Sequence, residues 1–170
     1  VGGYSYIMLK KEFEIIKQAI LNEVEGYEFY RMVAEQAGTN ESHEAFMELA
    51  KEELKHVEFL QNLFNKLKDS NEDDRILAFD ANPPSPDIYN WIKVGKQHTS
   101  MAMSIFGIGI QLEKASIEFY EKAKAETQIK EAEDLYDLLI RWEQLHLKQF
   151  TTQYNSYKED WWYDQGFAPF

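Results

Sequence analysis

Two short motifs combine a carboxylate with an imidazole at the spacing of one helical turn. Each is a Glu-x-x-His sequence, the first at Glu53 and His56 and the second at Glu143 and His146. Side chains three residues apart on a helix project from the same face, so each motif offers an oxygen and a nitrogen donor side by side. Such donors bind divalent iron, manganese or zinc. One such motif is common by chance on a solvated helix, so the residues around it must show whether it binds metal.

The two motifs belong to an internal repeat with an offset of 90 positions. The same offset places Glu23 on Glu113, and it places the Glu-Phe-Tyr string at 28–30 on the same string at 118–120. Identity between the halves is otherwise low. We therefore interpret the chain as two copies of a helical hairpin that diverged everywhere except at particular positions.

The repeated charged residues interrupt apolar stripes whose members recur three and four positions apart, the spacing of a helix face that packs on a neighbour. A buried carboxylate without a partner costs several kcal/mol, and the net stability of a domain is only about 5–15 kcal/mol. Two divalent cations would balance the four carboxylates, with neutral histidines completing the set. The sequence thus predicts a dinuclear metal site, or a degenerate descendant of one, at Glu23, Glu53, His56, Glu113, Glu143 and His146.

Chain breakers and helix caps divide the sequence into helices. Gly38 is typical of a helix end, Asn40 of the next N-cap, and Thr127 of a weak N-cap before the last helix. The two hairpins are separated by a segment longer than an antiparallel connection needs, which indicates a crossover. The predicted helices lie near 9–37, 41–68, 98–126 and 128–157, with a short one near 86–96.

The predicted fold is therefore an all-α, antiparallel four-helix bundle with a long crossover between the second and third helices. It forms one domain over residues 1–170, built from hairpins at about 9–68 and 98–157. The aromatic tail, residues 158–170, is expected to pack on its own bundle or on a second subunit, because such a cluster is costly to expose.

Composition excludes several classes of protein. The absence of cysteine rules out disulfides, thiolate zinc sites, iron–sulfur clusters and a cysteine nucleophile. A net charge of −12 opposes binding to nucleic acids and to anionic membranes. No segment has the roughly 20 apolar residues of a spanning helix. Residues 1–7 resemble no secretory signal and are interpreted as a non-native extension before Met8, so a cytoplasmic location is expected.

Several aromatic and imidazole side chains lie near the predicted site. Tyr27, Tyr30 and Tyr120 fall on the same helix faces as the glutamates. Packing in the core is one interpretation of these tyrosines. The other assigns to Tyr30 and Tyr120, each seven residues after a glutamate of the site, a hydrogen bond to a metal-binding carboxylate or the interception of an oxidising equivalent. His43 and His98 have no counterpart in the other half and are left out of the site.

These motifs resemble the ferritin-like di-iron superfamily, and within it the rubrerythrin-related proteins, across residues 9–157. The resemblance implies a ferritin-like bundle with iron as the metal, and manganese or zinc as alternatives. It also implies distinct roles for the six residues. Glu23 and Glu113 would be terminal carboxylates, Glu53 and Glu143 bridging carboxylates, and His56 and His146 terminal nitrogen ligands.

The chain departs from these relatives in three ways. It has no cysteines for a rubredoxin-like iron centre, so an external electron donor is expected. Ser116 stands where rubrerythrins carry an extra glutamate, and Leu54 stands where a haem-binding methionine would lie, so no haem is expected.

The expected function is oxidation of ferrous iron, or reduction of oxygen or hydrogen peroxide, at a centre inside the bundle. Iron storage and a metal-stabilised structural bundle without turnover are the alternatives. A single chain and a homodimer, with or without exchanged helices, both fit the ligand pattern.

Overall fold

The protein is an all-helical bundle in the computed structural model, which describes residues 3–69 and 99–166. The helices are α1 (Tyr6–Glu35), α2 (Asn40–Lys68), α3 (Thr99–Glu126) and α4 (Lys130–Asp164). No strand occurs within the described ranges, which confirms the predicted fold class. The short helix predicted near 86–96 lies outside the described residues. Within those same ranges, no helix is long and apolar enough to cross a bilayer.

Local hydrogen bonds explain where the helices begin. The Ser5 hydroxyl accepts from the Met8 amide at 3.3 Å, so α1 begins before the predicted position near 9. The Thr39 hydroxyl accepts from the Ser42 amide at 3.1 Å, which makes Thr39 the N-cap of α2 in place of the predicted Asn40.

The last helix differs from its prediction at both ends. The Thr127 hydroxyl accepts from the Ile129 amide at 3.1 Å, within the turn that precedes α4, and the helix begins at Lys130 instead of near 128. It continues to Asp164, beyond the predicted end near 157, so the first part of the aromatic tail is helical. Tyr163 is 83% exposed there, so this residue does not pack on its own bundle, and packing of the tail on a second subunit stays a prediction.

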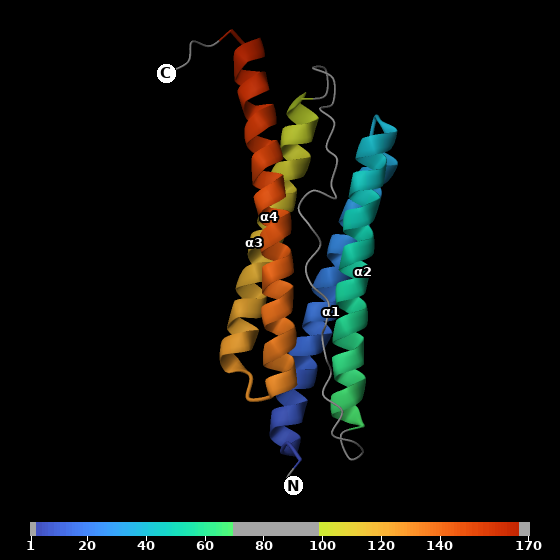
Figure 1. Ribbon diagram of the computed structural model, residues 1–170, viewed down its shortest axis with the longest axis vertical. Coiled ribbons are helices and arrows are strands. Elements are labelled where there is room, and N and C mark those ends of the chain that lie inside the picture. Colours follow the sequence, from blue (N-terminus) through green and yellow to red (C-terminus); the bar gives the residue numbers. More distant parts are fainter. Residues whose placement is uncertain (1–2, 70–98, 167–170) are drawn as a thin grey trace.

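Both hairpins are antiparallel, and they stand side by side (Figure 1). Helix α1 lies beside α2 and α3, while α4 lies beside α3 and α2. The end of α2 and the start of α3 lie at opposite ends of the bundle, so the two helices run in the same direction. This arrangement confirms the crossover connection between the second and third helices.

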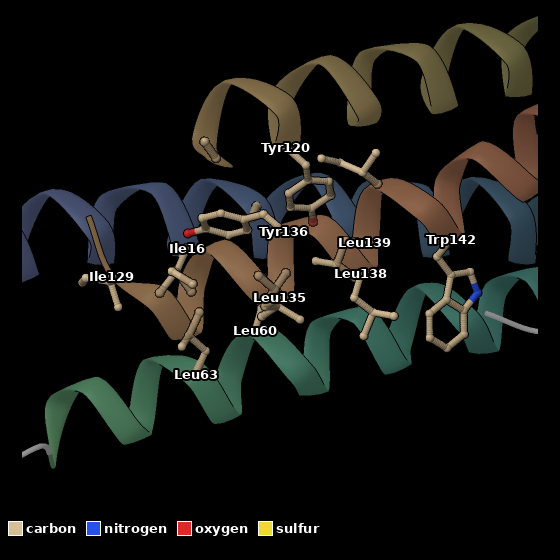
Figure 2. Close-up of a cluster of buried hydrophobic side chains, with 14 of the residues drawn as sticks. Ile16, Leu60, Leu63, Tyr120, Ile129, Leu135, Tyr136, Leu138, Leu139 and Trp142 are labelled. Carbon is tan, nitrogen blue, oxygen red and sulfur yellow. The ribbon is translucent and has the colours of Figure 1, made fainter. Parts of the chain in front are cut away.

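Two clusters of buried apolar side chains fill the interior, one toward each end of the bundle. One includes Ile16 of α1, Leu63 of α2 and Leu135 of α4, whose side chains converge between the helices (Figure 2). The other includes Leu49 of α2 and Phe150 of α4. On every helix the predicted metal ligands fall between the positions that belong to the two clusters. The apolar clusters therefore enclose the site from both ends.

A buried carboxylate ties the bundle together below the site, where sequence reasoning did not look for one. Glu12 is 3% exposed and accepts a hydrogen bond from the Tyr136 hydroxyl at 2.5 Å and another from the Thr127 hydroxyl at 2.8 Å. These bonds join the first part of α1 to α4 and to the α3–α4 turn. The repeat could not indicate this glutamate, because the equivalent position in the second half is Ala102.

Removal of the Tyr136 hydroxyl tests this link. We expect Tyr136→Phe to lower the free energy of unfolding by about 1–3 kcal/mol, because the buried Glu12 carboxyl group loses one of its hydrogen-bond partners. Chemical denaturation measures the difference. Tyr163→Phe, at an exposed position, is the matched control and should change stability by less than about 0.5 kcal/mol. Equal effects of the two variants would contradict a stabilising role for the Glu12 bond.

Candidate metal centre

The six residues predicted from the sequence lie together in the middle of the bundle. We call them the donor cluster, and each is at most 4% exposed. They form two groups, within each of which the donor atoms lie within 4.8 Å of one another. Glu53 and Glu143 belong to both groups. The first group is completed by Glu23 and His56, and the second by Glu113 and His146.

Each histidine presents Nδ1 to carboxylates from three helices. His56 Nδ1 lies 3.2 Å from Glu23 Oε2 and 3.1 Å from Glu143 Oε1. His146 Nδ1 lies 3.4 Å from Glu113 Oε1 and 3.5 Å from Glu143 Oε2. The two rings are nearly parallel, with centroids 6.2 Å apart. The arrangement thus has the approximate twofold character that the sequence repeat predicts.

The donor set fits divalent metal ions. Carboxylate oxygen and imidazole nitrogen are the ligand types that iron, manganese and zinc accept, and two such ions would balance four carboxylates. Among the described residues, Glu113 Oε2 is buried without a hydrogen-bond donor. A buried carboxylate oxygen left in this state is costly, and a cation would compensate it. The cluster can therefore hold metal.

Tyr30 and Tyr120 hold the cluster across the α1–α3 boundary. The Tyr30 hydroxyl of α1 donates to Glu113 Oε1 of α3, and the Tyr120 hydroxyl of α3 donates to Glu23 Oε1 of α1, both at 2.5 Å. Burial and the charge of Glu113 raise the pKa of Tyr30 well above its usual value, so its hydroxyl stays protonated and donates. The geometry thus agrees with the hydrogen-bonding interpretation of these tyrosines. Tyr27, by contrast, packs against the apolar cluster above the site.

The electrostatics of the cluster without metal favour bound protons. Burial and the charges of Glu143 and Glu23 raise the pKa of Glu53 well above its usual value. Burial by itself would lower the pKa of His56, but the charge of Glu23 and hydrogen bonds to Glu143 and Glu23 outweigh it and raise the pKa from 6.5 to about 10. Like charges crowded in a dry interior therefore retain protons near neutral pH.

One carboxylate of the cluster behaves differently. Burial would raise the pKa of Glu143, but hydrogen bonds with Glu113 and with both histidines outweigh it and lower the pKa well below the usual value. Glu143 therefore stays ionised at neutral pH, and the protonated groups around it compensate its charge.

Sequence reasoning missed a seventh buried polar residue at the site. Glu52 is 4% exposed, and its Oε2 accepts hydrogen bonds from His146 Nε2 at 2.5 Å and from Trp142 Nε1 at 2.9 Å. A signal was present, because Glu52 lies three residues after Leu49 and four before His56, so it shares their helix face. The repeat hid it, since the equivalent position in the second half is Trp142.

A cavity of about 220 Å³ reaches the donor cluster from the α1–α3 side. The four carboxylates of the cluster line it, together with Gly26 and Ser116, which are equivalent positions in the repeat. A Cβ atom at position 26 would lie 3.3 Å from Glu53 Oε2, closer than most such contacts. Small side chains on α1 and α3 thus leave this side of the site open to small molecules.

The pKa shifts predict how the stability of the metal-free protein depends on pH. The unfolded chain releases protons from glutamate near pH 4.5 and from histidine near 6.5, whereas the folded protein retains those on Glu53 and, to about pH 10, the one on His56. The folded state thus binds more protons in this window, so its stability should fall as pH rises from about 5 to 10.

Chemical denaturation in the presence of a chelator at several pH values measures this slope. Glu53→Gln removes one of the titrating groups and should flatten it, while the exposed Glu58→Gln should not. Stability that rises with pH across the window would contradict the assignment of bound protons.

Comparison with known proteins agrees with the geometry. The family model for rubrerythrin matches residues 14–154, which include α2, α3, most of α1 and α4, and the whole donor cluster. Searches of curated proteins and of solved structures gave no match. Because the matched region spans most of the chain, the protein belongs to the rubrerythrin family.

Proposed function

We propose that this protein holds two metal ions, iron in both positions, and that it oxidises ferrous iron or reduces oxygen or hydrogen peroxide. The observation that carries the proposal is the pair of buried donor groups that share Glu53 and Glu143. An isolated metal site would not need two groups with common carboxylates. Glu53 and Glu143 are the proposed bridging ligands between the two ions, in keeping with the family to which the chain belongs.

Each metal position has its own terminal ligands in this proposal. Glu23 and His56 serve one position, and Glu113 and His146 serve the other. When bound, the ion pair supplies electrons and Lewis acidity for the reduction of an oxidant. Zinc or manganese would occupy the same donors, so metal identity depends on supply as well as on ligand type.

The surrounding residues orient the ligands and exclude bulk water. Tyr30 and Tyr120 fix the terminal carboxylates by hydrogen bonds from the opposite hairpin. Leu49 and Leu139, both at most 1% exposed, contribute to the apolar clusters on either side. The cavity between α1 and α3 is the proposed route for a small oxidant. The proposal includes an electron donor outside the bundle, because residues 1–170 contain no cysteine with which to bind an iron–sulfur or rubredoxin-type centre.

Anaerobic titration with ferrous ion, followed by stopped-flow absorbance after addition of oxygen or peroxide, tests the function. We expect two irons per chain and rapid oxidation, with the faster oxidant identifying the substrate. The double variant Glu53→Gln with Glu143→Gln should lose both properties, since it removes the shared ligands. The matched control is Glu58→Gln with Glu159→Gln, which makes the same changes at exposed positions on the same helices.

Other outcomes separate the rival functions. More than two irons per chain would favour iron storage. Two bound ions that greatly stabilise the fold without any oxidation would favour a structural metal site. Equal oxidation by the wild type and the double variant would refute the proposed centre.

Replacement of Gly26 tests the fit of Glu53. Gly26→Ala should gain helix propensity of up to about 1 kcal/mol but displace the Glu53 carboxylate, because the new methyl group lies 3.3 Å from Oε2. We expect its metal affinity to fall about ten-fold, a size typical of disturbed ligand orientation. Gly107→Ala on α3 is the control, since among the described residues its Cβ would contact only Tyr154, at 3.5 Å. Calorimetric zinc titration of both variants gives the affinities, and equal values would contradict the expected displacement.

A further inference from the structure

The two halves of the repeat make equivalent hydrogen bonds across the α1–α3 boundary. Tyr30 and Tyr120 occupy equivalent positions, and so do their acceptors Glu113 and Glu23. Each tyrosine donates to the glutamate of the other hairpin at the same distance of 2.5 Å. On this side of the site, the two metal positions have matching hydrogen-bonded supports.

The opposite boundary, between α2 and α4, breaks this symmetry. The equivalent positions there are Glu52 and Trp142, a carboxylate in one half and an indole in the other. Both side chains are 4% exposed, and the Trp142 indole extends from α4 toward α2 (Figure 2). The Trp142 N–H donates to Glu52 Oε2 at 2.9 Å, so the two residues form one contact across the boundary.

The two histidines consequently have different environments on the side away from the cluster. His146 Nε2 bonds to Glu52 Oε2 at 2.5 Å, and the glutamate acts as acceptor. His56 Nε2 is buried and has no hydrogen-bond partner among the described residues. Its ring instead meets the Trp142 indole edge-on, with centroids 4.9 Å apart and planes at 78°. An indole has no acceptor lone pair to offer this nitrogen.

A carboxylate behind a metal-binding histidine has a known physical effect. By accepting the Nε2 proton, it fixes the tautomer in which the Nδ1 lone pair faces the metal, and it makes that nitrogen a stronger donor. Loss of such a partner typically costs 10–100-fold in metal affinity. Glu52 supplies this support to His146, and position 142 supplies none to His56.

We propose that Glu52 is a positioning residue that makes the two metal positions unequal. The position served by Glu113 and His146 fills first and binds metal more tightly, and the position served by Glu23 and His56 fills last. This inference rests on the proposed dinuclear site. It also gives the repeat a functional meaning, since divergence at one pair of equivalent positions distinguishes two otherwise matching sites.

Zinc titration of the whole chain, followed by NMR of ¹⁵N-labelled histidine rings, tests the order of filling. The chain has four histidines, and single replacement of each by glutamine assigns its signals. The His146 Nδ1 signal should shift during the first equivalent of zinc and the His56 signal during the second. Before zinc is added, the His146 signals should already report a proton on Nε2, the nitrogen that bonds to Glu52.

Two substitutions at Glu52 separate positioning from general structural effects. Glu52→Met keeps the length of the side chain but removes the acceptor, and it should weaken the first zinc-binding step about 10–100-fold while the second changes by less than about three-fold. Glu52→Gln keeps an oxygen acceptor without the charge, so it should restore part of the difference. Circular dichroism and the unfolding transition confirm that each variant is folded.

Trp142→Phe is the matched control within the same contact. It removes the N–H that donates to Glu52 but leaves the bond between Glu52 and His146, so His146 should still fill first. Glu58→Gln on the outer surface of α2 controls for the loss of a negative charge. If Trp142→Phe equalised the two steps as fully as Glu52→Met, loosened packing would explain the result and the inference would be wrong.

The outcomes distinguish the inference from the function on which it rests. Fewer than two zinc ions per chain would overturn the proposed dinuclear site and the inference with it. Two ions that shift both histidines together, or His56 first, would overturn the inference alone. The wild-type order decides the question even if neither Glu52 variant folds.

Discussion

The four glutamates of the donor cluster lie together in the interior of this bundle, and their charge is the constraint on which the rest of the structure depends. Carboxylates so far from water destabilise a fold unless cations, protons or hydrogen-bond donors compensate them. Without metal, protons shared with two histidines and hydrogen bonds from two tyrosines provide this compensation. The same close approach of carboxylates that raises their affinity for protons also gives the cluster donor groups and negative charge for cations.

The fold places this cluster at a level where apolar packing can enclose it. Separate clusters of buried side chains lie toward the two ends of the bundle, and every helix contributes donors between them. Helices α2 and α3 run in the same direction (Figure 1), and each helix of the first hairpin lies beside its equivalent in the second, α1 beside α3 and α2 beside α4. This relation converts a repeat along the chain into a nearly twofold arrangement in space.

The α1–α3 and α2–α4 boundaries of that arrangement differ in structure. The α1–α3 side is supported by two equivalent tyrosines and opens through a cavity beside Gly26 and Ser116. The α2–α4 side is packed with Glu52 and Trp142, whose different chemistry distinguishes the histidines. The cavity that reaches the donor cluster and the difference between the two histidines therefore lie at opposite boundaries of the site.

The sequence by itself determined the helical fold, the two hairpins and the six members of the donor cluster. It could do so because helical spacing and an internal repeat are both visible along the chain without knowledge of the fold. A charged residue within an apolar stripe is also informative, because its burial destabilises the fold unless another group compensates the charge. The ends of the helices were predicted less accurately, since α4 continues through residues whose aromatic character suggested a separate tail. The tertiary structure alone decided the partners of Tyr30 and Tyr120, the burial of Glu12 and the contact between Glu52 and Trp142. Those contacts join residues from 83 to 124 positions apart or break the repeat, and only the packing of one hairpin on the other brings such side chains within hydrogen-bond distance.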